Sequence, residues 1–118
     1  MPFAFVESKT PKGSPLLEIH SSGQVALADA EAFGARVEPD GPNHRWRVLL
    51  RTEKGIEYEP AARRYFPTTQ GKYLAIATIV TNPIVRAAIN MMIRLSGGAR
   101  DFRLFSAEAE ALAWLDSI

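Results

Sequence analysis

Apolar residues in this chain fall into short runs that alternate with segments of helical periodicity. Five runs are typical of β-strands, being rich in β-branched and aromatic residues and bounded by turn residues, and they lie at residues 3–6, 16–19, 46–51, 73–81 and 102–105. The run at 73–81 contains no charged residue. Because a strand covered on both faces has no solvated side, this run predicts a central, buried strand.

Four segments are predicted to be helical, at residues 27–37, 58–66, 83–95 and 107–116. Asn82 and Pro83 mark the start of the third, because an asparagine side chain caps free backbone N–H groups and proline is tolerated in the first turn. Gly97 and Gly98 favour its end, and Ser106 is predicted to cap the fourth helix. The order ββαβαβαβα predicts an α/β fold in which much of the sheet is parallel and helices pack over it.

Composition limits the classes of protein that the chain can represent. Its 118 residues provide one core, so we expect a single domain over residues 1–118. With 47% apolar and 23% charged residues and no run of 18 apolar residues, a disordered chain and a membrane span are both excluded. No secretory signal peptide is recognisable, from which we expect a cytoplasmic location.

Few residues in the chain suit catalysis or metal binding. There is no cysteine, and the two histidines leave little for a transition metal. His20 adjoins Ser21, but neighbours on an extended chain point to opposite faces, and His44 is expected to be a solvated loop residue. No glycine pattern for a phosphate or dinucleotide is present. We therefore expect no catalytic residue, no cofactor and a protein that is not an enzyme.

The net charge of +1 conceals an uneven distribution. Residues 1–44 sum to −3, residues 45–103 to +7 and the last fifteen to −3. The middle of the chain is therefore expected to present a positive face, unless folding interleaves the segments. Because no basic stretch is interleaved with stacking aromatic residues, we expect no nucleic-acid partner.

The segment 83–95 has more apolar surface than one buried face requires. At 100° per residue, Arg86, Asn90 and Arg94 occupy an arc of roughly 80°, whereas a surface helix buries a stripe on the order of 100°. The surplus has three possible uses: packing within the domain, a homodimer or other protein interface, or an apolar ligand pocket. The candidate partner-binding residues are Ile84, Ala88, Met91, Met92 and Leu95.

The start of the same helix is a second candidate site. Asn82 follows the predicted central strand, at the sheet edge where open α/β folds bind ligands and a helix N-terminus attracts anions. Arg51 and Lys54 end another strand at that edge. A small anionic or amphipathic ligand is the functional hypothesis for these three residues, and a plain helix cap at Asn82 is the alternative.

Three stretches, VALADAE at 25–31, AARRYF at 61–66 and FSAEAEALAWL at 105–115, resemble bacterial STAS-like (anti-sigma-factor-antagonist-like) small proteins. The segment AIATIVTNPIVRAAI at 75–89 is similar to the family's buried strand and following helix start. The resemblance spans about residues 16–117, so residues 1–15 are assigned from pattern alone. It implies a mixed sheet of four to five strands, helices mostly on one side, and a protein that acts by binding.

The chain departs from this family at one functional position. Phosphoswitch members carry a serine after the third strand, whereas this chain has no serine between Ser22 and Ser96. Thr52 is the one aliphatic hydroxyl in the corresponding stretch. Thr52 is therefore the candidate phosphosite, and the departure argues against phosphorylation-driven partner switching.

Overall fold

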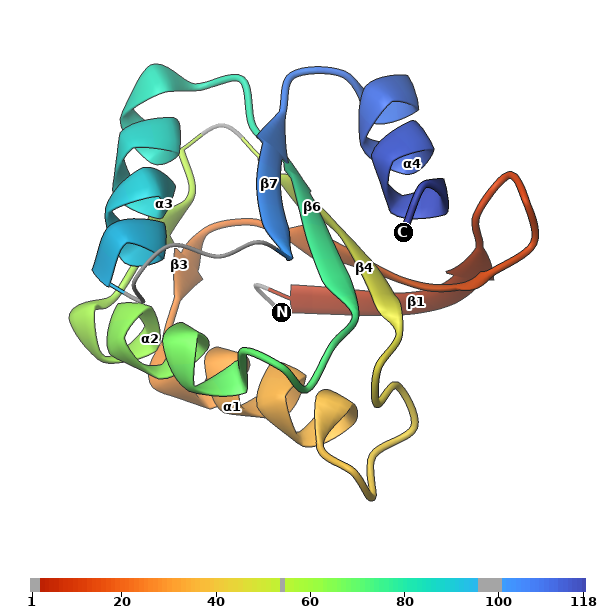
Figure 1. Ribbon diagram of the computed structural model, residues 1–118. Helices are drawn as coiled ribbons and strands as arrows, with labels where there is room; N and C mark the ends of the chain where they lie inside the picture. The colour runs from red at the N-terminus through yellow and green to blue at the C-terminus, as the bar shows by residue number, and fades with distance from the viewer. Residues whose placement is uncertain (1–2, 54, 96–100) are drawn as a thin grey trace.

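Five strands form the main sheet of the protein, hydrogen-bonded in the order β1-β2-β4-β6-β7 (Figure 1). The structure is a computed structural model and describes residues 3–53, 55–95 and 101–118. The strands are β1 (Phe3–Lys9), β2 (Pro15–Ser21), β4 (Arg47–Thr52), β6 (Ala75–Ile79) and β7 (Phe102–Phe105). β1 is antiparallel to β2 and the other three pairs are parallel. The carboxyl ends of β2, β4, β6 and β7 therefore share one edge of the sheet.

Helices cover the two sides of this sheet unequally. They are α1 (Leu27–Val37), α2 (Pro60–Tyr65), which continues into the 3₁₀ turn η1 (Phe66–Thr69), α3 (Pro83–Leu95) and α4 (Glu108–Asp116). Figure 1 shows α1, α2 and α3 on one side of the sheet and α4 on the other. The predicted α/β class, strand and helix order and mixed sheet are confirmed. None of the described helices has the length and apolarity needed to cross a membrane.

A second, two-stranded sheet was not predicted from the sequence. Here β3 (Gln24–Val25) pairs in parallel with β5 (Glu57–Tyr58). Two-residue strands are too short to show alternation, so the sequence pattern contains no signal for them. This pairing also corrects the helix predicted at 58–66, which begins at Pro60 because Glu57 and Tyr58 are extended.

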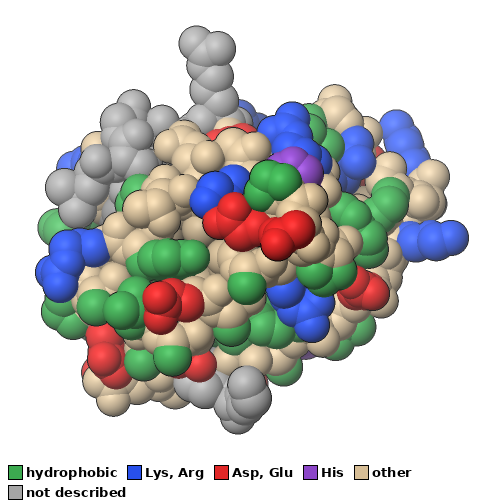
Figure 2. Space-filling model, turned by 90° about the horizontal axis from the view of Figure 1, so that it is seen from below, with side chains coloured by type: hydrophobic (Ala, Val, Ile, Leu, Met, Phe, Trp, Pro, Cys, Tyr) green, Lys and Arg blue, Asp and Glu red, His purple; other side chains and the backbone are tan. Residues whose placement is uncertain are grey.

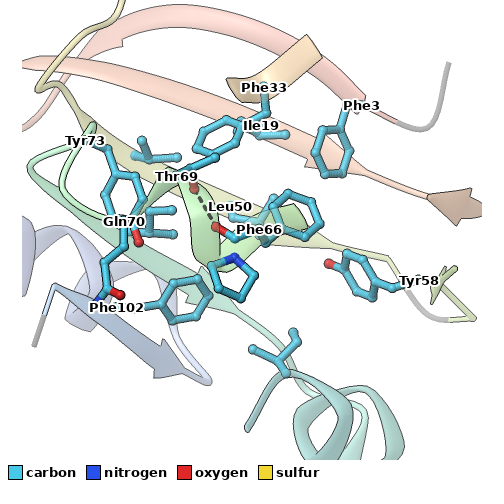
Figure 3. A pocket seen from close by; sticks show the side chains of 14 residues that line it. Phe3, Ile19, Phe33, Leu50, Tyr58, Phe66, Thr69, Gln70, Tyr73 and Phe102 are labelled. Carbon is cyan, nitrogen blue, oxygen red and sulfur yellow. Dashed lines mark hydrogen bonds between the residues drawn. The ribbon is translucent and has the colours of Figure 1, made fainter. Parts of the chain in front are cut away.

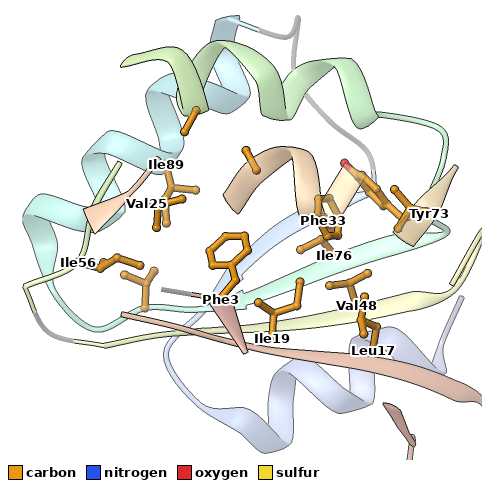
Figure 4. Packing of buried hydrophobic residues seen from close by; sticks show 14 of the residues in the cluster. Phe3, Leu17, Ile19, Val25, Phe33, Val48, Ile56, Tyr73, Ile76 and Ile89 are labelled. Atoms are coloured by element: carbon orange, nitrogen blue, oxygen red, sulfur yellow. The ribbon is translucent and has the colours of Figure 1, made fainter. Parts of the chain in front are cut away.

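The alternation of side chains along the strands produces two apolar layers. In β4, Val48 belongs to the larger core beneath α1, α2 and α3, whereas its neighbour Leu49 belongs to the core beneath α4. Figure 4 shows the larger core, in which residues of β1, β2, β4 and β6 meet Phe33 of α1 and Ile89 of α3. On the other side the small residues Ala75 and Ala77 of β6 pack with α4.

The start of α4 differs from the prediction. The N-cap is Ala107, which has no side chain that can accept a hydrogen bond, and the helix begins at Glu108. Ser106 instead accepts a hydrogen bond from Nη2 of Arg86 (3.3 Å). Glu108 and Glu110 lie in the first turn, where negative charge is favourable to the helix dipole. The predicted stop at Gly97 and Gly98 lies outside the described residues.

Folding interleaves the charged segments of the chain. Each ion pair found among the described residues joins the basic central segment to an acidic terminal one: Arg51 with Glu18, Arg51 with Glu108, and Lys72 with Glu38. On the face seen in Figure 2, acidic and basic side chains lie among one another. The charge of +7 in the central segment is therefore partly neutralised by residues far away in the sequence.

Candidate functional site

One side of α3 packs on the core and the other side carries exposed apolar residues. Val85 and Ile89 are buried, whereas Ile84 is 80% exposed and Met91 is 59% exposed. The described part of the chain therefore leaves Ile84 and Met91 uncovered, so the first of the three uses, packing within the domain, does not apply to them. The side chains of Met92 and Leu95 lie outside the described residues.

Small residues separate the two large exposed ones. Ala87 is exposed and Ala88 is half-buried, and both lie between Ile84 and Met91 on the same side of the helix. We call Ile84, Ala87, Ala88 and Met91 the α3 face. A face with large residues at its ends and alanine in its middle allows another helix to approach closely.

The start of α3 has the geometry of a helix cap. Oδ1 of Asn82 accepts a hydrogen bond from the backbone N–H of Ile84 (2.9 Å), which occupies the side chain that was a candidate for ligand binding. The backbone of Arg51 does lie at the expected sheet edge, opposite Ile79 of β6. Its guanidinium, however, donates to the carboxylates of Glu18 and Glu108. The structure thus does not bring the charge of Arg51 to Asn82, and Lys54 lies outside the described residues.

Thr52 is held by the sheet. Its hydroxyl donates a hydrogen bond to the carbonyl of Ile79 (2.9 Å), and the residue is half-buried. A phosphate on this oxygen would break that bond between β4 and β6.

Both histidines make contacts within the fold. Nδ1 of His44 lies 2.7 Å from the carbonyl oxygen of Val37, and because a carbonyl only accepts, Nδ1 carries the hydrogen. The expected solvated loop residue is therefore a half-buried one that binds the end of α1. Nε2 of His20 lies 3.4 Å from Arg51, whereas the hydroxyl of Ser21 donates to the carbonyl of Arg51 (2.9 Å). The two neighbours contact different groups of Arg51, the guanidinium and the backbone carbonyl, and not each other. No cluster of three metal-binding residues occurs in the described ranges.

A polar cluster lies on the α4 side of the sheet around Glu18. The Ser8 hydroxyl donates to one carboxylate oxygen of Glu18 (2.5 Å), and Arg51 donates to the other. The hydrogen bond from Ser8 holds the pKa of Glu18 below its usual value of 4.5; burial opposes this shift, and Arg51 adds to it. This cluster joins β1, β2 and β4, and through Glu108 it also joins α4.

The lowered pKa of Glu18 predicts a contribution to acid stability. Because the folded-state pKa lies below the unfolded value of 4.5, the stabilisation is fully present above pH 4.5 and is lost as the pH falls through the folded value. Thermal unfolding of Glu18→Gln between pH 7 and pH 3 should therefore show a smaller loss of melting temperature on acidification than the wild type. Glu110→Gln, at an exposed position of α4, is the control and should follow the wild type. An unchanged acid slope in Glu18→Gln would contradict the assignment.

A cavity of about 60 Å³ lies between the main sheet and η1 (Figure 3). Every strand of the main sheet contributes to its floor, through Phe3, Ile19, Val48, Leu50, Ile76 and Phe102. Its roof includes Phe33 of α1, Ile89 of α3, and Phe66 and Pro67 of η1. Among the described residues that line the cavity, none has a charged side chain.

The cavity could not be predicted from local sequence pattern, because its walls come from segments scattered along the chain. One local signal was present. Proline cannot continue an α-helix, so Pro67 ends the helical hydrogen bonding of α2 and favours the tighter turn that roofs the cavity.

The mixed sheet with an antiparallel edge strand, three helices on one side and one on the other, is a STAS-like fold. Among solved structures it matches the crystal structure of an uncharacterized protein of the DUF3478 family with a SpoIIAA-like fold, from Shewanella loihica PV-4. That match has a TM-score of 0.64 and 17% sequence identity, and it covers 96% of this chain and 93% of that chain. At this identity the likeness shows the fold alone, and it confirms the predicted resemblance at that level.

The family of the chain follows from a second comparison. Residues 24–118 match the family model described as a domain of unknown function, DUF7793, and the chain belongs to that family. The comparison with curated proteins gave no match.

Proposed function

We propose that this protein is a non-enzymatic STAS-like interaction module that forms a homodimer through the α3 face. The observation that carries this proposal is the exposure of Ile84 (80%) and Met91 (59%) on a helix whose other side is in the core. Removing such apolar side chains from water is the main driving force of protein association.

The α3 face is complementary to itself. When two copies of α3 pair antiparallel about a two-fold axis between Ile89 and Asn90, Met91 lies opposite the partner's Ala88, and the reverse contact is equivalent. Met91 thus meets a small residue at two equivalent contacts, which is the arrangement that lets two helices pack closely, and Ile84 lies opposite position 95 of the partner. A two-fold interface requires this kind of self-complementary pattern.

Basic side chains flank the α3 face. Arg94 is exposed and Arg86 is half-buried, and neither has an acidic neighbour on α3. With a rise of 1.5 Å per residue, Arg86 and the partner's Arg94 lie roughly 1.5 Å apart along the helix axis. This pairing therefore includes a repulsion between guanidinium groups, which salt screens.

The dimer is tested by placing a charge on the α3 face. Sedimentation or light scattering from low to high micromolar concentration should show a dimer for the wild type, and Met91→Glu should raise the dissociation constant at least about tenfold, because it leaves a charge in an apolar contact. Ala109→Glu is the matched control, since it adds the same charge at an exposed position of α4, on the other side of the main sheet, and should leave the dimer intact. If the wild type stays monomeric at high micromolar concentration and Met91→Glu has the same mass in solution, the homodimer proposal is wrong.

The alternative function, an anionic-ligand site at the start of α3, has weaker support. The side-chain oxygen of Asn82 already accepts the hydrogen bond that caps α3, and Arg51 already has two carboxylate partners. Ile84 and Met91 are exposed, and for that reason we favour the interaction module.

A further inference from the structure

We propose that the cavity beneath η1 is a binding site for a small, uncharged and mainly apolar molecule that carries one hydrogen-bond-accepting oxygen. This site is separate from the α3 face. It adjoins Ile89 on the buried side of α3, whereas the homodimer proposal uses Ile84 and Met91 on the exposed side.

The described lining residues carry no charge, and from this we infer that the ligand is uncharged. Aliphatic and aromatic side chains dominate the walls, and the polar residues among them are Tyr58, Thr69, Gln70 and Tyr73. Burying an ion without a countercharge is strongly unfavourable. The ligand is therefore neutral, unlike the anion expected near Asn82.

Tyr58 provides the polar contact. Its hydroxyl oxygen is buried and has no hydrogen-bond partner, and in Figure 3 the hydroxyl is directed inward toward Phe66. The nearby hydroxyl of Ser21 donates instead to the carbonyl of Arg51 (2.9 Å). Because an unpaired buried hydroxyl costs free energy, an accepting oxygen on a ligand would be bound favourably there.

The protonation state of Tyr58 suits this role. Burial raises the pKa of Tyr58 to about 12, with the nearby Ser21 opposing the shift. The phenol is therefore neutral at physiological pH and has a hydrogen to donate.

The volume sets the size of the buried part of the ligand. The cavity of about 60 Å³ is smaller than the apolar cavities of about 150 Å³ that accept benzene. Gln70 is exposed, and Pro67 and Phe102 are half-buried, so the cavity is reached beside η1 without separating the strands. A short-chain ketone such as 2-butanone is about as large as benzene, so it fits with its acetyl end in the cavity and its ethyl end at the opening beside η1.

The proposal is tested with two probes of equal shape. The ¹⁵N-labelled protein is titrated with 2-butanone and with 2-methyl-1-butene, in which a methylene group replaces the carbonyl oxygen. We expect saturable chemical-shift changes around Phe66, Thr69 and Phe102, and an affinity about fivefold higher for the ketone, as one neutral hydrogen bond provides. Tyr58→Phe should remove the preference for the ketone and leave the affinity for the hydrocarbon unchanged.

Two further measurements separate binding from a structural role. Tyr58→Phe removes an unpaired hydroxyl, so its melting temperature should equal or exceed that of the wild type. Tyr65→Phe is the matched control, because Tyr65 is half-buried and does not line the cavity, and it should keep the preference for the ketone. Absence of saturable shifts with both probes, equal affinities in the wild type, or shifts confined to Ile84 and Met91 would each overturn the proposal. None of these outcomes depends on whether the protein dimerises.

Discussion

Replacing Phe33 with alanine is expected to lower the free energy of unfolding by about 3–5 kcal/mol, the usual range for a buried phenylalanine. Phe33 is 2% exposed, and its ring centroid lies 6.2 Å from that of Phe66 and 6.3 Å from that of Tyr73. The substitution removes these contacts and adds empty volume beside an existing cavity. Because the sheet and the helices around this space are fixed, the neighbouring side chains relax only partly into it, and most of the added empty volume remains as a cost in stability.

The measurement is urea unfolding at one low protein concentration, so that association does not change the apparent stability. Leu27→Ala is the control on the same helix, because Leu27 is 38% exposed. Its cost should be no more than about 1 kcal/mol, as for partly exposed positions in general. A Phe33→Ala protein as stable as the control would show that α1 does not anchor the larger core.

The second large effect is expected from Leu115→Ala, at about 2–5 kcal/mol. Leu115 is fully buried in the smaller core, against Leu49 of β4 and the two alanines of β6. Since α4 is the helix that covers this side of the described sheet, no neighbouring helix can move in to fill the space. The Arg47 side chain donates a hydrogen bond from Nε to the backbone carbonyl of Leu115 (2.8 Å), and this bond does not depend on the Leu115 side chain and should persist.

Hydrogen exchange distinguishes this effect from a general loss of stability. In Leu115→Ala, amide exchange in α4 should accelerate more than exchange in α1, because the two helices pack on different cores. Ile118→Ala is the control, since Ile118 is 45% exposed. Equal acceleration in both helices would indicate that the two layers unfold as one unit.

The strand β6, around Ile76, is an element that could be predicted from the sequence, because its segment contains no charged residue. Local pattern was enough to identify β6 as a central strand, and the structure places it between β4 and β7. Asn82 and Pro83 likewise set the start of α3, because a cap is a local interaction over two or three residues. The surplus apolar surface of α3 also followed from periodicity, but packing within the domain was one of its possible uses, and only the structure leaves Ile84 and Met91 exposed.

Other features were not accessible to local reasoning. Ser106 has the chemistry of an N-cap, yet it bonds to Arg86, because β7 and α3 come together only in the folded chain. Arg51 was considered for an anion site, but Glu18 and Glu108, 33 and 57 positions away in sequence, bind its guanidinium. Which group binds the guanidinium depends on which strands and helices are neighbours in the fold, and local sequence does not show this.

By itself, the sequence determined the α/β class, the order of strands and helices, the buried strand β6 and the excess of apolar residues on α3. Each of these depends on the spacing of residues a few positions apart, which the backbone geometry of helix and strand converts directly into a pattern. Only the tertiary structure decided the short β3–β5 pair, the partners of Arg51 and the cavity with the unpaired Tyr58 hydroxyl. Those features depend on contacts between distant segments, and a contact exists only once the sheet order and the packing of η1 over it are set.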